Sequence, residues 1–261
     1  MKVVLLAGGQ GMRIREETEF KPKPMIAIGE RPIIWHIMKM YAQYGFNDFV
    51  VCLGYKGHVL KDYFLNFDIL NADVTVRLGR GMHRDVTIND THGEENWTVT
   101  LADTGLAAMT GARLARVRRY IDSALFMMTY GDGVSNVDVA AAVAFHKRHG
   151  KIATVTGVYP PSRFGDMVVQ GDRVERFLEK ASVGTSCING GFFVMDQRVF
   201  DYVSDDDTCT FEREPMERLA RDGQLMVYHH RGFWQCMDTI RDLKLLEELW
   251  QSGQAPWKVW P

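Results

Sequence analysis

Short apolar runs alternate with helical periodicity along the first part of the chain. Residues 2–7 (KVVLLA) form an unbroken apolar run, which is typical of a strand buried on both faces of a parallel sheet. Apolar positions then recur at helical spacing from Pro32 until Gly45 stops the pattern. Residues 48–54 (DFVVCLG) and 58–67 (HVLKDYFLNF) repeat the order of strand and helix. This alternation predicts an α/β fold.

The middle of the chain continues the pattern after one interruption. Residues 73–102 contain two short strands separated by a polar stretch, HRDVTINDTHGEEN, which has no apolar period and which we expect to be an exposed excursion. A helix around 110–121 precedes a strongly apolar strand at 124–130 (ALFMMTY). Residues 137–150 predict a helix that ends in basic residues and a glycine.

Shorter β elements follow from Pro160 onward. The segment MVVQGDRVERFLEK predicts a hairpin that turns at residues 171–172, and INGGFFVM (188–195) predicts another strand. A helix over 239–252 closes the chain. Because no linker or internal repeat interrupts the sequence, we predict one α/β unit over residues 1–261, with a second half richer in β structure.

The composition argues against several classes of protein. The formal net charge is −2, so the chain has no polybasic character for binding nucleic acid or an anionic membrane. No apolar run approaches the roughly 18 residues needed to cross a bilayer, and the first run breaks into glycines too early for a signal peptide. Four cysteines are scattered without metal-like spacing: Cys52, Cys187, Cys209 and Cys236. We therefore expect reduced thiols in a cytoplasmic protein.

The first candidate for chemistry is the loop after the first strand, Gly8-Gly9-Gln10-Gly11-Met12-Arg13. Glycines let backbone N–H groups approach phosphates closely, and Arg13 adds a charged fork. The loop is not a Walker motif, because no Gly-Lys-Ser/Thr follows. It is not a dinucleotide-binding turn either, because Ile14 stands where the third glycine is required. A glycine turn without a ligand is the alternative.

The next candidate is a basic loop, FKPKPM (20–25). Prolines hold Lys23 on a stiff, extended backbone, which suits an ammonium group placed beside a leaving pyrophosphate. For Lys21 a solvated position on the loop is an equally good interpretation.

Two carboxylates predict a metal site. Asp132 lies between glycines directly after the strand at 124–130, and the carboxyl ends of strands line the ligand crevice in open α/β sheets. There it is suited to bind Mg²⁺ beside phosphates, although a turn-forming Asp is the alternative. Asp238 follows another extended segment and is a candidate for the second ligand.

Candidates for sugar binding lie in the second half. Glu179 can accept hydrogen bonds from sugar hydroxyls, and the adjacent Lys180 can pair with a sugar phosphate. Asn189 and Gly190 belong to a segment whose glycines let the backbone lie close to a sugar ring. Taken alone, a Glu-Lys pair is usually a solvated surface feature.

Together and in this order, the motifs resemble those of the sugar-1-phosphate nucleotidyltransferases. That family carries a leading L-A-G-G-x-G-x-R, a K-P loop, a central G-D, an E-K-P segment, N-x-G and a late Asp. The chain is most similar to its glucose-1-phosphate cytidylyltransferase branch, over essentially the whole length. The matching segments include KPKPM, ERPIIWHIMKMY, GYKGHVLKDYF, TYGDGV, INGGFFV, GFWQCMDT and APWKVW. The family fold implies a mixed, mostly parallel sheet flanked by helices.

The resemblance also implies an activity: CTP and glucose 1-phosphate, or a close sugar 1-phosphate, give a CDP-sugar and pyrophosphate with Mg²⁺ as cofactor. Residues 1–133 would mainly bind the nucleotide and residues 134–261 the sugar phosphate. The implied nucleotide contacts are Leu6, Gly8, Gly9, Gly11, Arg13, Lys23, Thr110, Gly111 and Arg113. The implied sugar-phosphate contacts are Glu179, Lys180, Asn189 and Gly190. Arg13, Lys23 and Asp132 would be catalytic, with Asp132 and Asp238 as metal ligands.

Some positions depart from the family pattern. Met12 replaces the threonine of G-T-R, Ala181 the proline of E-K-P, and Cys236 the proline of Q-P-M-D. The sugar is therefore less constrained than the reaction class. The same reaction with another nucleotide or another phosphorylated acceptor is one alternative. A non-catalytic binding protein is the other, and the retained charged residues argue against it.

The resemblance further implies a homo-oligomer. Trp257 and Trp260 lie in a C-terminal tail, and tryptophans there are costly to leave in water. The tail either folds back onto its own domain or packs against a neighbouring subunit. We favour the neighbour, with residues 79–96 as a second contact surface.

Overall fold

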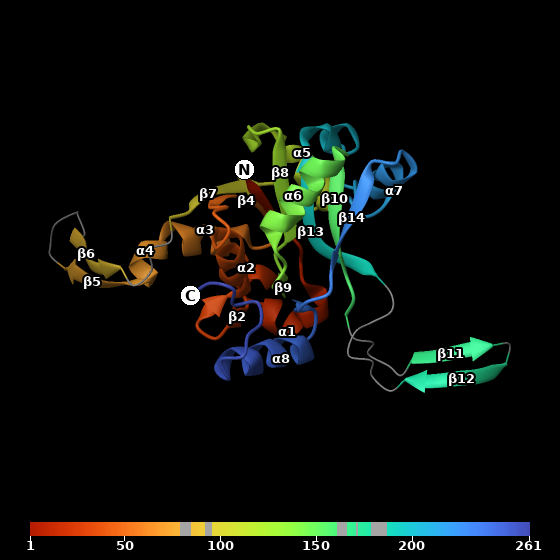
Figure 1. Cartoon of the computed structure of the whole chain (residues 1–261). Coiled ribbons are helices and arrows are strands. Elements are labelled where there is room, and N and C mark those ends of the chain that lie inside the picture. The colour runs from red at the N-terminus through yellow and green to blue at the C-terminus, as the bar shows by residue number, and fades with distance from the viewer. Residues whose placement is uncertain (79–84, 92–95, 161–165, 171, 179–186) are drawn as a thin grey trace.

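A seven-stranded sheet forms the centre of the protein, shown as a computed structural model in Figure 1. The structure describes residues 1–78, 85–91, 96–160, 166–170, 172–178 and 187–261. In spatial order the strands are β14 (Leu225–His230), β10 (Ala153–Val158), β13 (Ile188–Asp196), β8 (Leu125–Tyr130), β1 (Val3–Leu6), β4 (Asp48–Leu53) and β7 (Thr98–Asp103). Strands from both halves of the sequence therefore share one sheet.

The sheet is mixed and mostly parallel, as predicted. β1 pairs in parallel with β4 and β8, β4 with β7, and β10 with β14. Within this sheet β13 runs in the opposite direction, antiparallel to both β8 and β10. The parallel register Leu6↔Tyr130 brings the carboxyl ends of β1 and β8 to the same edge, where the glycine loop and Asp132 follow.

Helices cover both faces of the sheet, which explains the continuous apolar runs in its strands. Val3 and Leu5 belong to one hydrophobic core, whereas Val4 and Leu6 belong to the other. The first core is covered by α2 (Ile33–Ala42), α3 (Gly57–Leu65), α6 (Val139–His149) and α8 (Ile240–Gln251), and the second by α5 (Thr110–Arg116) and α7 (Glu214–Arg221). Among the described residues, no helix has both the length and the apolar composition that a membrane crossing requires.

The remaining elements are short. They are α1 (Arg15–Thr18), α4 (Phe67–Leu70), the paired strands β2 (Ala27–Ile28) and β3 (Arg31–Pro32), the paired strands β9 (Gly133–Ser135) and β15 (Trp234–Cys236), and the 3-10 turns Met12–Ile14, Lys23–Met25, Arg118–Tyr120 and Gln197–Asp201. The predicted second-half hairpin is confirmed as β11 (Asp166–Gln170) and β12 (Arg173–Leu178).

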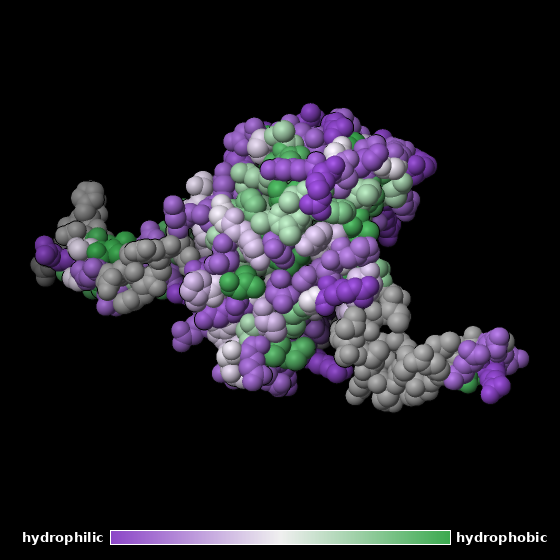
Figure 2. All heavy atoms as spheres, in the orientation of Figure 1, coloured by the Kyte–Doolittle hydropathy of each residue, from purple (hydrophilic) through white to green (hydrophobic). Residues whose placement is uncertain are grey.

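The polar excursion contains a strand that the hydrophobic pattern did not indicate. β5 (Ala72–Arg77) pairs with β6 (Asp85–Thr91) in a hairpin that projects from the body of the molecule (Figure 1). The register places Val74 opposite Ile88 and Val76 opposite Val86, so these side chains share one face of the hairpin. All four are at least 36% exposed, and apolar side chains gather on this hairpin in Figure 2.

The C-terminal tail folds back onto its own domain, so our preference for a neighbouring subunit was wrong. Trp257 is fully buried and stacks against Phe233 and Trp250. Its indole N–H donates to Nδ1 of His36 (3.4 Å), and Nε2 of His36 lies 3.0 Å from the carbonyl of Ile28. Burial lowers the pKa of His36 to about 4, so the imidazole is neutral and bridges the tail and the core.

We predict that Trp257→Ala destabilises the protein by about 3–5 kcal/mol, because it removes a fully buried aromatic side chain. Lys258→Ala, at the exposed neighbouring position, should change the free energy of unfolding by less than about 0.5 kcal/mol. Urea unfolding measures both values. If Trp257→Ala were as stable as the unsubstituted protein, the packing of the tail against its own domain would be disproved.

Candidate active site

The glycine loop turns sharply at the carboxyl end of β1. Gly11 has a φ of 63°, in the left-handed region that favours glycine, and a Cβ there would lie 2.9 Å from Cγ2 of Thr18. A Cβ on Gly8 would lie 2.2 Å from Nη1 of Arg113, whereas a Cβ on Gly9 would meet no atom of the described residues within 4 Å. Two of the three glycines are therefore required by the packing of the loop itself.

Arg113 holds this loop in place through hydrogen bonds from its guanidinium group. Its guanidinium donates to the carbonyl of Gly8 (3.0 Å), the carbonyl of Leu53 (3.0 Å), the hydroxyl of Thr104 (2.8 Å) and the carbonyl of Gly105 (2.8 Å). Burial lowers the pKa of Arg113, and the side chain is only 5% exposed. Arg113 thereby joins the loop after β1, the end of β4 and the segment after β7, and its predicted contact with a nucleotide stays a prediction.

A pocket of about 600 Å³ opens over the loop, a size typical of small-molecule sites. Its lining includes the predicted residues Leu6, Gly8, Gly9, Gly11, Arg13, Lys23, Thr110, Arg113 and Asp132. Gly111 is not among the lining residues; its N–H donates to the carbonyl of Cys209 (2.9 Å), and a Cβ there would lie 2.5 Å from the thiol of Cys209. Gly111 therefore has a packing role, and its predicted nucleotide contact stays a prediction.

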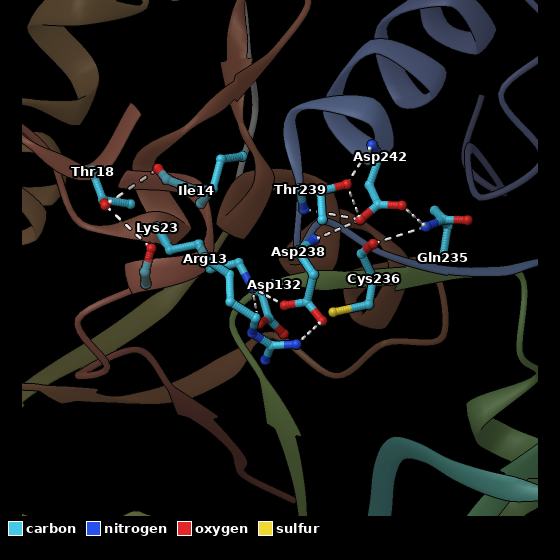
Figure 3. Close-up of polar contacts among 11 residues, drawn as sticks. Arg13, Ile14, Thr18, Lys23, Asp132, Gln235, Cys236, Asp238, Thr239 and Asp242 are labelled. Carbon is cyan, nitrogen blue, oxygen red and sulfur yellow. Dashed lines mark hydrogen bonds and ion pairs between the residues drawn. The ribbon is translucent and has the colours of Figure 1, made fainter. Parts of the chain in front are cut away.

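Two carboxylates and two cations meet at the edge of this pocket (Figure 3). The ammonium of Lys23 lies 2.6 Å from Oδ2 of Asp132 and 2.6 Å from Oδ1 of Asp238. The guanidinium of Arg13 lies 2.7 Å from Oδ2 of Asp238. The neighbouring Lys21 takes no part, since it pairs with Glu17 at 3.5 Å. The two lysines of the basic loop therefore have different partners, and Lys23 is the one that contacts the carboxylate pair.

The charges of this cluster reinforce one another. Burial alone lowers the pKa of Lys23, but the negative charge of Asp132 and the hydrogen bonds to Asp132 and Asp238 help to outweigh it, and the pKa is raised. Burial likewise raises the pKa of Asp238, yet its bonds to Lys23 and the charge of Arg13 outweigh that effect and hold the pKa below its usual range. Lys23 and Asp238 are therefore both charged at neutral pH.

Strand pairing brings the two carboxylates together. β9 pairs with β15 so that Gly133 lies opposite Cys236, and the N–H of Met237 donates to the carbonyl of Asp132 (2.8 Å). Asp242 then fixes the backbone after β15, because its Oδ2 accepts from the N–H groups of Asp238 (3.1 Å) and Thr239 (2.9 Å). Asp242 was not among the predicted site residues, although Thr-x-x-Asp at a helix start is a recognisable capping-box signal.

These side chains have the chemistry of a site for a hard divalent cation. An oxygen of Asp132, an oxygen of Asp238 and the sulfur of Cys236 lie within 4.8 Å of one another. Carboxylate oxygens are the ligands that hard cations such as Mg²⁺ and Mn²⁺ prefer. Burial, followed by the charge of Asp132, raises the pKa of the Cys236 thiol. Cys236 is therefore a neutral wall of the site, and the two carboxylates would hold the ion.

A second pocket of about 330 Å³ adjoins the first and shares Arg13, Tyr130 and Asp132 with it. Asn189 and Gly190, predicted to contact the sugar phosphate, line this second pocket. The indole N–H of Trp234 donates to the carbonyl of Gly190 (2.7 Å), which fixes that wall.

Two further predicted sugar-phosphate contacts, Glu179 and Lys180, lie outside the described residues. Ala181, one of the departures from the family pattern, also lies outside them.

Glu212 is a site residue that no motif indicated. One oxygen accepts from the hydroxyl of Thr110 (2.6 Å), and the other accepts from the hydroxyl of Tyr130. Glu212 also lines the second pocket. Its carboxylate links the start of α5 to the end of β8, a contact that the isolated sequence DTCTFEREP does not suggest.

Comparisons with known proteins show which family the chain is similar to. The chain is 49% identical to glucose-1-phosphate cytidylyltransferase of Salmonella typhi and 40% identical to a probable glucose-1-phosphate cytidylyltransferase of Bacillus subtilis, with 100% of both chains covered in each case. The fold is similar to HddC from Yersinia pseudotuberculosis (TM-score 0.66, 19% identity, 95% of this chain and 99% of that one). It is also similar to a UDP-glucose pyrophosphorylase complexed with UDP-glucose (TM-score 0.67, 12% identity, 97% and 98%).

The model of the nucleotidyl transferase family matches residues 2–249, which is most of the sequence. Together with the full-length relatives, this match establishes that the chain belongs to the nucleotidyl transferase family.

Proposed function

We propose that this protein transfers a cytidylyl group from CTP to glucose 1-phosphate, giving CDP-glucose and pyrophosphate. The full-length similarity to glucose-1-phosphate cytidylyltransferases supports the choice of both substrates. We place the activity in the cytoplasm, a location consistent with four free cysteines. The nucleotide would bind mainly to residues 1–133 and the sugar phosphate mainly to residues 134–261.

The observation that carries the proposal is the junction of the two pockets. The larger pocket is lined by the glycine loop and the smaller one by Asn189 and Gly190, and both include Arg13 and Asp132. A nucleotide in the first pocket and a sugar phosphate in the second would meet at this junction. The reacting phosphate groups would therefore lie beside the cluster of charged side chains formed by Arg13, Lys23, Asp132 and Asp238.

Positioning and charge neutralisation would drive the reaction. A phosphate oxygen of glucose 1-phosphate attacks the α-phosphorus of CTP and forms the new P–O bond. The bond from the α-phosphorus to the bridging oxygen breaks, and pyrophosphate leaves with that electron pair. Arg13 and Lys23 would neutralise the charge on the phosphates, with N–H groups of the glycine loop as further donors. Mg²⁺, held by Asp132 and Asp238, would supply additional charge neutralisation.

A pyrophosphate-release assay that crosses the four ribonucleoside triphosphates with a panel of sugar 1-phosphates tests the proposal. We expect kcat/KM for CTP with glucose 1-phosphate to exceed that of every other pair by about a hundredfold or more. Release with a different nucleotide or acceptor would keep the reaction class and overturn the substrates. No release with any pair would favour a binding protein without catalysis.

The metal ligands are tested by Asp132→Asn and Asp238→Asn. Each should lower kcat by about a hundred- to a thousandfold, because each removes a charge from the metal site while keeping the side-chain shape. Asp122→Asn, at an exposed carboxylate that pairs with Lys2, is the matched control and should leave kcat unchanged. Activity that persists in either site variant, or in excess chelator, would contradict the assignment.

We also propose that the protein forms homo-oligomers through the apolar face of the β5–β6 hairpin. Val76→Asp combined with Ile88→Asp should lower the mass measured by light scattering, because charges in this face would oppose its burial. Thr75→Asp places one such charge on the opposite face of the hairpin and should leave the mass unchanged. A monomeric unsubstituted protein would overturn the proposal.

A further inference from the structure

Lys23 occupies the position between the carboxylates that a divalent cation would need. Its ammonium lies 2.6 Å from an oxygen of Asp132 and 2.6 Å from an oxygen of Asp238. Its side chain is only 10% exposed. A cation that bridged the same two oxygens would meet the ammonium, so Lys23 has to move before an ion can take this position.

The charges of the cluster balance as they stand. Asp132 and Asp238 contribute two negative charges, and Lys23 and Arg13 contribute two positive ones. A divalent cation that entered alone would give the cluster a net positive charge and would displace Lys23 from both partners. Repulsion of this kind is costly at a half-buried site, where water screens charges only in part.

A bound triphosphate reverses this balance. Its negative charges compensate the extra cation and also give the displaced ammonium new partners. Lys23 can reach them with little movement, because it lines the nucleotide pocket and its stem runs beside the glycine loop. A Cβ built on Gly11 would lie 3.2 Å from Cβ of Lys23 and 3.7 Å from its Cδ. Rotation about the outer bonds of the side chain would therefore carry the ammonium from the carboxylates towards this loop.

We propose that Lys23 is a resident counter-cation that keeps divalent metal out of the carboxylate pair until nucleotide phosphates arrive, and then exchanges the carboxylates for the phosphates. Metal and nucleotide therefore bind together, and the protein without nucleotide has little affinity for the metal. This inference rests on the proposed function, since it takes the triphosphate as the incoming anion. Arg13 does not fill the same role, because its side chain is 75% exposed and, among the described residues, its guanidinium pairs with Asp238 alone.

The test is a titration of the full-length protein with Mn²⁺ in the absence of nucleotide. Electron paramagnetic resonance measures the concentration of free Mn²⁺ at each step. Lys23→Met should bind one Mn²⁺ at least about tenfold more tightly than the unsubstituted protein, because the competing charge is gone. Lys21→Met makes the same change on the same loop, away from the carboxylates, and should bind like the unsubstituted protein. Adding Asp238→Asn to Lys23→Met should abolish the gain.

Tight Mn²⁺ binding by the unsubstituted protein, or no gain in a folded Lys23→Met variant, would overturn the inference. Circular dichroism establishes folding, and Lys23→Gln provides a second neutral variant if Lys23→Met is unfolded. The titration contains neither CTP nor sugar phosphate. Its failure is therefore distinguishable from failure of the proposed reaction, which the pyrophosphate assay measures on the unsubstituted protein.

Discussion

Repulsion between two neighbouring carboxylates is the constraint on which the site depends. β9, β15 and the start of α8 hold Asp132 and Asp238 side by side, and neither charge could be half-buried there without a cation. The Lys23–Met25 turn delivers that cation from a third segment of the chain. Three distant stretches of sequence are thereby joined at one point, and the two pockets share a wall there.

Most of the fold could be predicted because hydrophobic patterning reflects local burial. The runs at 2–7, 48–54 and 124–130 became neighbouring strands of the central sheet, buried on both faces. β6 was not predicted because it carries only two apolar side chains, Val86 and Ile88, on an exposed hairpin. A strand that does not pack against the core needs no longer run of apolar residues, so its sequence resembles a polar loop. The tail was misjudged for a different reason: its partners, His36 and Phe233, come from distant segments.

The site was predictable only where a short motif carries its own chemistry. Lys23 and Asp132 stand out beside prolines and glycines, and the structure brings them into contact. Arg113 and Glu212 carry no such signal, since their roles come from acceptors and donors on loops far away in sequence. A buried arginine and a surface arginine look alike in a sequence. Their difference lies in desolvation, which only the assembled fold determines.

The shared wall between the pockets has an evolutionary consequence. Ala108 and Met109 border only the larger pocket, whereas Phe192 and Trp234 border only the smaller one. Under the proposed function, substitutions at these outer walls would alter one substrate at a time and leave Arg13 and Asp132 intact. Relatives on this scaffold would then diversify their nucleotide and sugar preferences independently, whereas substitutions at Arg13 or Asp132 would affect both substrates together.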